Sequence, residues 1–168
     1  LGSVLAADGR YEDSVRVVDE ALAIARAAND LSEIALLQSR AGSSALTSGD
    51  LDRAGAASRE ALELTTRLDD TRGIAYCTAL VAQVDLALGD AALALSGAEK
   101  ALSIFEGLGE RRGALRAVAV VAEATLALGL HGKVIDVATA GLENYGDAGD
   151  ADAEERLRVA LAEARRGA

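Results

Sequence analysis

The sequence predicts an all-α fold in which pairs of antiparallel helices stack sideways into a solenoid. Glycine recurs at a fixed interval of forty residues, at Gly9, Gly49, Gly89 and Gly129. Twelve residues after each glycine comes a small residue followed by leucine, at Ala21-Leu22, Ala61-Leu62, Ala101-Leu102 and Gly141-Leu142. The 168-residue chain has no proline, and its apolar residues follow the three-and-four spacing of helices rather than the alternation of strands. Internal repetition of this kind is typical of helical arrays.

Each forty-residue unit is expected to contain two helices. The first helix should begin after an acidic residue that favours a helix N-terminus, at Asp30, Asp70, Glu110 and Asp150. It should run about seventeen residues to the glycine, which closes a helix in the left-handed conformation. The second helix should begin after the glycine, with Asp50 and Asp90 as caps, and end near Arg26, Arg67 and Glu106.

These boundaries predict a single array over residues 1–168. Residues 1–29 form a partial first repeat, residues 30–69, 70–109 and 110–149 form complete repeats, and residues 150–168 form a C-terminal capping helix. The capping helix carries Arg158 and Arg165 where the preceding first helix has Val118 and Thr125, and a polar outer face is how a solenoid ends. Leu1 corresponds to the middle of a first helix, so we expect the chain to be a fragment of a longer protein or to be covered by a partner there.

The units resemble tetratricopeptide repeats (TPR). That family has a small residue in the first helix, a glycine between helices, an alanine five residues later and Ala-Leu twelve residues later. Two units here match, with Gly42, Gly49, Ala54 and Ala61-Leu62 in one and Ala82, Gly89, Ala94 and Ala101-Leu102 in the next. The resemblance implies a right-handed α-α superhelix.

Three features depart from the common TPR pattern. The period is forty where the usual value is about thirty-four, the proline is missing, and Gln38, Thr78 and Val118 replace large aromatic residues of the first helix. These departures point to the longer-repeat variant found in bacterial regulatory proteins and kinesin light chains. A HEAT- or armadillo-like array is the alternative, since it shares the period but does not require the Gly and Ala-Leu spacing.

Composition argues against several classes of function. The net charge of −10 and the lack of a basic patch argue against contact with nucleic acid. The longest apolar stretch, residues 114–130, contains Arg116 and Glu123, which makes it a poor membrane span. Cys77 and His131 are single residues of their kind, so we expect a buried inert thiol, an exposed histidine, and no metal or cofactor. No nucleophile–base pair is visible, and we expect a cytoplasmic protein that is not an enzyme.

The resemblance implies a concave surface on the first helices that binds an extended peptide or a helix of a partner protein. Transferred to this sequence, its lining residues are Leu36, Ser39, Ser43, Tyr76, Ala79, Gln83, Arg116, Ala119 and Glu123. The alternative is that they form only the solvated side of each helix. Polarity rises from Ser43 through Gln83 to Glu123, which favours a partner with a basic or amide-rich segment. The Lys and Asn residues of TPR domains that bind chaperone tails are absent here, so we expect no such binding.

The function predicted from the sequence is protein–protein interaction. The array would be the regulatory or scaffold part of a larger bacterial protein, such as a transcriptional regulator. Two alternatives stay open: a domain that senses a small molecule or signalling peptide, and a scaffold that forms a homodimer.

Overall fold

The computed structural model of the protein describes residues 2–167, with side chains described at Tyr11 and from residue 15 onward. Within that range every regular element is an α-helix and there is no strand, which confirms the all-α class. The helices are α1 (Gly2–Ala27), α2 (Leu31–Ser48), α3 (Leu51–Arg67), α4 (Thr71–Ala87), α5 (Ala91–Leu108), α6 (Arg111–Ala127), α7 (His131–Tyr145) and α8 (Ala151–Gly167).

The even-numbered helices begin where the sequence predicted, directly after the four acidic residues. Three of these residues cap the helix that follows with a side-chain oxygen. Asp30 accepts a hydrogen bond from the amide of Glu33 at 3.0 Å, and Asp70 accepts one from the amide of Gly73 at 3.0 Å. Asp150 caps α8 in the same way, and Glu110 makes no such bond at the start of α6. Amide groups of the first turn lack partners within the helix, so each aspartate fixes where its helix starts.

Glycine ends three first helices as expected. Gly49, Gly89 and Gly129 have φ angles of +85°, +91° and +73°, which is the left-handed conformation of a helix C-terminus. Asp50 caps α3 by accepting a hydrogen bond at Oδ1 from the main-chain nitrogen of Arg53, at 3.1 Å. Asp90 stands in the corresponding place before α5 but makes no side-chain cap bond.

The break expected at Gly9 is wrong, because α1 runs without interruption from Gly2 to Ala27. Gly9 is followed by Arg10, which has no side-chain oxygen to cap a second helix, whereas Gly49 is followed by Asp50. A glycine inside a helix costs only about 1 kcal/mol, so the helix can continue through it. Gly129 also lacks a following aspartate, but there α6 and α7 pack against each other and stabilise the turn. The expectation about Leu1 lies outside the described residues.

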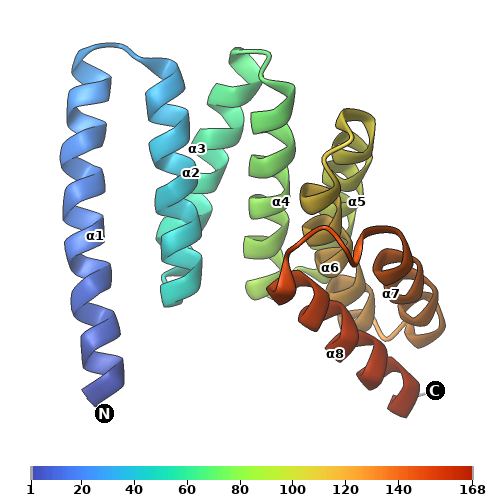
Figure 1. Ribbon diagram of the computed structural model, residues 1–168. Helices are drawn as coiled ribbons and strands as arrows, with labels where there is room; N and C mark the ends of the chain where they lie inside the picture. Colours follow the sequence, from blue (N-terminus) through green and yellow to red (C-terminus); the bar gives the residue numbers. More distant parts are fainter. Residues whose placement is uncertain (1, 168) are drawn as a thin grey trace. The chain divides into compact units, whose positions relative to one another are not determined.

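The chain divides into two compact units, Leu1–Leu80 and Val81–Ala168, with the division inside α4. In unit 1, α2 packs against both α1 and α3, and Figure 1 shows α1 and α2 antiparallel to each other. Buried side chains from all three helices form its core, among them Leu22, Ile34, Leu37 and Leu64. Gly42 of α2 lies so close to α3 that a Cβ atom there would be 3.2 Å from the amide nitrogen of Ser58. This explains why the first helix needs a small residue at that point.

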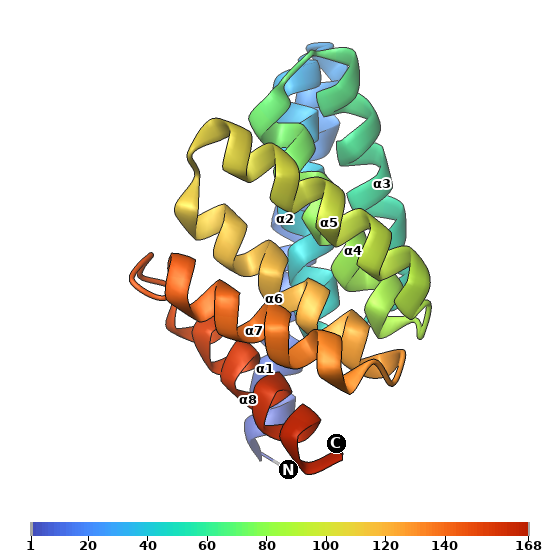
Figure 2. The same ribbon diagram turned by 90° about the vertical axis from the view of Figure 1, so that its right-hand side faces the viewer.

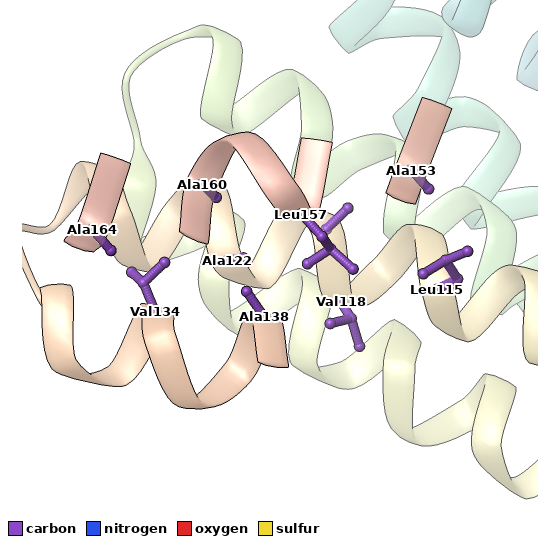
Figure 3. Close-up of a cluster of buried hydrophobic side chains, with 10 residues drawn as sticks. Leu115, Val118, Ala122, Val134, Ala138, Ala153, Leu157, Ala160 and Ala164 are labelled. Carbon is purple, nitrogen blue, oxygen red and sulfur yellow. The ribbon is translucent and has the colours of Figure 1, made fainter. Parts of the chain in front are cut away.

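Unit 2 contains α5 to α8, which follow one another as antiparallel neighbours in Figure 2. The last helix, α8, packs against both α6 and α7. Leu157 of α8 is fully buried, and in Figure 3 its side chain extends towards Val118 of α6. Ala160 and Ala164 of α8 complete the buried side of the helix, opposite Val134 and Ala138 of α7. Small residues in α8 allow this close approach to two helices at once.

The three residues that replace the large aromatics of TPR sequences are all buried. Gln38, Thr78 and Val118 lie inside the helix packing. Gln38 donates a hydrogen bond from its side-chain amide to Glu60 of α3, which satisfies the buried polar group. The Thr78 hydroxyl has no hydrogen-bond partner among the residues that the structure describes. The position is therefore a core position in this chain too, filled by smaller side chains.

Ion pairs connect helices that are one repeat apart on the side of the second helices. The two partners in each pair are thirty-four residues apart in the chain. The pairs are Arg26–Glu60 (2.9 Å), Arg53–Asp19 (2.6 Å) and Lys133–Glu99 (3.3 Å). All lie at the surface with at least one partner well exposed, and an exposed ion pair stabilises a protein by only about 0–1 kcal/mol.

Among residues 2–167, none of the helices combines the length and the apolar character that crossing a bilayer requires.

Candidate functional site

A pocket with a volume of about 540 Å³ lies in unit 1 between α2, the C-terminal end of α3 and the first turns of α4. We call it the α2/α4 pocket. Its lining residues are Ser32, Ala35, Leu36, Ser39, Thr65, Leu68, Asp70, Arg72, Gly73, Tyr76 and Cys77. A volume of this size is in the range of ligand-binding clefts in proteins.

Three large apolar side chains stand at this pocket with much of their surface in solvent. Leu36 is 45 % exposed and Tyr76 is 37 % exposed, and Leu68 is exposed to a similar extent. They come from three different segments, α2, the turn after α3, and α4. A group of exposed apolar side chains around a concave surface is the usual mark of a place where another molecule binds.

Thr65 and Cys77, which both line the pocket, are buried. Cys77 is almost completely buried, as the sequence predicted. Burial raises the pKa of its thiol, although side-chain hydrogen bonding with Thr65 and Ser39 acts in the opposite direction. A buried thiol with a raised pKa is a weak nucleophile at neutral pH, so this cysteine contributes to packing rather than to chemistry.

The N-terminal end of α4 is held in place by Asp70 and Gly73. Oδ1 of Asp70 accepts a hydrogen bond from the main-chain nitrogen of Gly73, at 3.0 Å. A Cβ atom on residue 73 would lie 2.3 Å from Oδ2 of Asp70 and 2.7 Å from Cγ2 of Thr65. Glycine is therefore required here for the carboxylate to lie over the first turn, and this contact fixes the edge of the pocket that Arg72 and Tyr76 extend.

Three of the predicted site residues, Leu36, Ser39 and Tyr76, are brought together in the α2/α4 pocket. Ser43 is exposed one turn further along α2 and is not part of the lining. Sequence reasoning missed Leu68, Asp70, Arg72 and Gly73, because it considered only the first helices and not the turn between α3 and α4. The sequence signal that could have indicated this part of the pocket is Leu68, an apolar residue in a turn next to Asp69 and Asp70.

Two of the predicted lining residues are core residues instead, so their assignment to a groove is wrong. Ala119 is fully buried in the core of unit 2, in the same cluster as Leu157, and Ala79 is also buried. The small side chains at these positions serve close approach between helices. Gln83 is half-buried.

Arg116 is exposed, but it is committed to an ion pair. Arg116 and Arg112 of α6 both donate to Oδ2 of Asp150, with Arg112 Nε at 3.2 Å, and the Asp150 side chain is only 6 % exposed. Burial by itself raises the pKa of Asp150. The hydrogen bonds from Arg116, the Ala153 amide and Arg112 outweigh that effect and bring the pKa below its usual value. Arg116 thus holds the start of α8 against α6.

Glu123 is also engaged in an ion pair within the protein. Arg156 of α8 donates to its two carboxylate oxygens, from Nε at 2.8 Å and from Nη2 at 2.6 Å. The hydrogen bond to Glu123 holds the pKa of Arg156 above its usual value, against the effect of burial. A bidentate, half-buried pair of this kind leaves Glu123 little capacity to bind a partner's cation.

His131 is half-buried rather than exposed, which corrects the sequence prediction. It is the first residue of α7, and its Nδ1 is buried with no hydrogen-bond partner in the described part of the chain. A Cβ atom on Gly167 would lie 2.8 Å from Cε1 of the ring, so the imidazole lies against the C-terminal end of α8. Among the residues that the structure describes, no group of three or more His, Cys, Asp or Glu side chains is arranged to hold a metal ion.

Comparison with known proteins identifies the fold. No protein-family model matches the sequence, and no curated protein matches it. Among the solved structures that do match is a TPR-like protein from Chlorobium tepidum TLS, which is 26 % identical, with a TM-score of 0.69. The match covers 79 % of this chain and 92 % of that one. The chain therefore has a TPR-like helical repeat fold, a class that characteristically serves as a scaffold for protein–protein interaction.

Proposed function

We propose that this protein is a protein-interaction module that binds a peptide or an extended protein segment in the α2/α4 pocket. The TPR-like fold makes a protein partner the natural occupant, since such arrays present concave surfaces for recognition. The observation that carries the proposal is the exposure of Leu36, Leu68 and Tyr76 around one pocket of about 540 Å³.

The energetics favour an apolar anchor from the partner. Complete burial of a large apolar side chain is worth about 1.5–3 kcal/mol. Since Leu36, Leu68 and Tyr76 are each less than half exposed, covering them would recover about 1 kcal/mol apiece. A leucine- or phenylalanine-sized side chain of the partner, placed among the three, would gain a similar amount. At the same pocket the hydroxyl oxygen of Ser39 can accept a hydrogen bond from the partner's main chain, and the guanidinium of Arg72 carries several donors.

The same proposal covers the larger protein to which this module belongs and its location in the cell. The module is the regulatory or scaffold part of a larger bacterial protein, such as a transcriptional regulator, in the cytoplasm, and it has no catalytic role of its own. It belongs to the longer-repeat TPR variant. Support comes from the forty-residue interval at which α2, α4, α6 and α8 begin, and from the bacterial source of the matching structure. The charge of −10 supports a partner other than nucleic acid.

Selection of peptides from a random library on the full chain, followed by titration of the selected peptides, tests the pocket. Leu36→Asp should weaken binding at least about tenfold, because it places a charge among the apolar side chains, and Tyr76→Ala should weaken it by a similar factor. Leu93→Asp is the matched control, since Leu93 of α5 is 61 % exposed and does not line the pocket.

The expected pattern is loss with the two pocket variants and unchanged affinity with the control. Peptides that bind Leu36→Asp and Tyr76→Ala as tightly as the unchanged protein would place the binding surface elsewhere and end the proposal for this pocket.

A further inference from the structure

We propose that unit 2 carries a second docking surface, between α6 and α8, which takes a helical segment of a partner with an apolar side chain between two Lys or Arg residues. We call it the α6/α8 pocket. It has a volume of about 320 Å³, and its lining residues are Glu123, Leu126, Asp152, Glu155, Arg156, Val159, Ala160 and Glu163. The inference goes beyond the proposed function, because it concerns another surface and a partner that is recognised by its positive charge as well as by an apolar side chain.

The apolar part of this pocket centres on Val159. This side chain is 46 % exposed, on a helix whose other outward residues are mostly charged. One repeat earlier the corresponding residue is Ala119 of α6, which is fully buried in the cluster that α8 helps to form. Packing of α8 against α6 buries Ala119, whereas no described helix packs over the equivalent residue of α8, Val159. A helix that packed on α8 as α8 packs on α6 would bury Val159.

The charge of the pocket selects the partner. Four carboxylates and one arginine line it. The arginine, Arg156, is already paired with Glu123 and lies 3.9 Å from Asp152. Glu155 and Glu163 have neither an ion pair nor a side-chain hydrogen bond with any of the side chains described, at Tyr11 and residues 15–167. The uncompensated charge at this pocket is therefore negative, and a cationic segment complements it.

The spacing of these groups sets the geometry of the partner. Glu155 lies four residues before Val159, and Glu163 lies four residues after it. Residues four apart lie on one face of a helix, so the two carboxylates flank the apolar side chain along α8. A partner helix with Leu at its centre and Lys four residues to either side matches all three. A second copy of this chain is a poor occupant, since each copy carries a net charge of −10.

The sequence had placed a basic partner at Glu123. The structure assigns that role instead to Glu155 and Glu163 of α8, because Arg156 binds Glu123 of α6 with two hydrogen bonds of 2.8 and 2.6 Å. A test of the basic-partner idea at Glu123 alone would break this internal pair and would not address the carboxylates that face solvent.

Three labelled synthetic helical peptides serve as probes for the full chain. The first has Leu between two Lys residues at the spacing above, the second has Glu in place of both Lys, and the third has Ala in place of Leu. We expect the first to bind at least about tenfold tighter than either of the others in fluorescence anisotropy. Its affinity should fall between about 0.05 M and about 0.5 M salt, because the flanking charges are screened.

Two double charge reversals locate the site. Glu155→Lys with Glu163→Lys should weaken binding of the first peptide at least about tenfold. Asp136→Lys with Glu143→Lys on α7 changes the net charge equally at exposed positions outside the pocket, and it should change the affinity by less than about twofold. If the first pair of substitutions disturbs the helix content, Glu155→Gln with Glu163→Gln removes the charge with less perturbation and should give the same direction.

Several outcomes overturn the proposal. One is equal loss with the two double reversals, which would mean attraction to the overall charge of the protein. Others are failure of the first peptide to bind, and binding of the Glu peptide that equals or exceeds it. Sedimentation that shows a dimer of the protein, dissociated by the Glu155 and Glu163 reversals, would identify a second copy as the occupant. Leu36→Asp should leave binding of this peptide unchanged, which separates this surface from the α2/α4 pocket.

Discussion

Replacement of Gly141 by alanine should destabilise unit 2, although alanine is the usual residue at that position. The corresponding residues of the other second helices are Ala61 and Ala101, and both are fully buried. Gly141 lies inside α7, where a Cβ atom would be 2.4 Å from Cγ1 of Val118 and 3.3 Å from Cδ1 of Leu157. The space that a methyl group occupies in the other repeats is taken up here by side chains from α6 and α8.

The expected size of the effect follows from two opposing contributions. Alanine in place of glycine inside a helix favours folding by about 1 kcal/mol. An extra methyl group in a packed core costs about 1–3 kcal/mol, and Val118 cannot turn aside easily because β-branched residues in helices have one preferred rotamer. The difference is a net loss of about 0–2 kcal/mol, and because Val118 has little freedom to move we expect Gly141→Ala to lower the free energy of unfolding by the upper part of this range, about 1–2 kcal/mol.

Urea unfolding followed by far-ultraviolet circular dichroism measures this difference. Gly132→Ala is the matched control, since Gly132 is in the same helix and a Cβ atom there would meet nothing within 4 Å. That control should be unchanged or up to about 1 kcal/mol more stable. Val118→Ala made together with Gly141→Ala should cost less than the sum of the two single substitutions, because it removes the atom that clashes. A Gly141→Ala protein as stable as the unchanged one would refute the packing argument.

Three further predictions concern the same molecule. Leu157→Ala should lower the free energy of unfolding by about 3 kcal/mol, because it leaves a cavity between α6, α7 and α8; a loss below about 1 kcal/mol in urea unfolding would mean that the side chain is not packed as described. The pKa of Asp150 is lowered by folding, so its contribution to stability is complete above its unfolded pKa of about 3.9 and is lost as the pH falls through its folded pKa. The stability difference between the unchanged protein and Asp150→Asn should therefore shrink in acid, and a difference independent of pH would contradict the ion pairs. Cys77 should react with a thiol reagent at pH 8 only as fast as unit 1 opens, with a rate that rises in sub-denaturing urea, whereas rapid labelling of the folded protein would show that the thiol is accessible.

The positions of the helices could be predicted because each boundary depends on a local signal. Asp30, Asp70 and Asp150 cap the helices that follow them, and Gly49 ends a helix with a positive φ angle. Gly9 shows where such reasoning fails. The same residue at the same interval lies inside a continuous helix, because a glycine permits a break without requiring one.

The candidate site could be predicted only in part. Helical spacing placed Leu36, Ser39 and Tyr76 on one face, and the structure brings them together. The same spacing could not show that α8 covers Ala119 or that Arg156 binds Glu123, because both depend on how one helix is rotated against another. Leu68 was missed for a related reason, since the turn after α3 reaches the pocket only when the chain is folded.

The ion pairs between helices one repeat apart have a mechanical consequence for unit 2. One pair, Lys133–Glu99, ties α7 to α5, and another, Arg156–Glu123, ties α8 to α6. The two links lie on different rows of helices, one joining α5 and α7 and the other α6 and α8. We therefore expect the two links to favour one curvature of unit 2 by a small amount, and dissolved salt, by screening the charges, to weaken that preference.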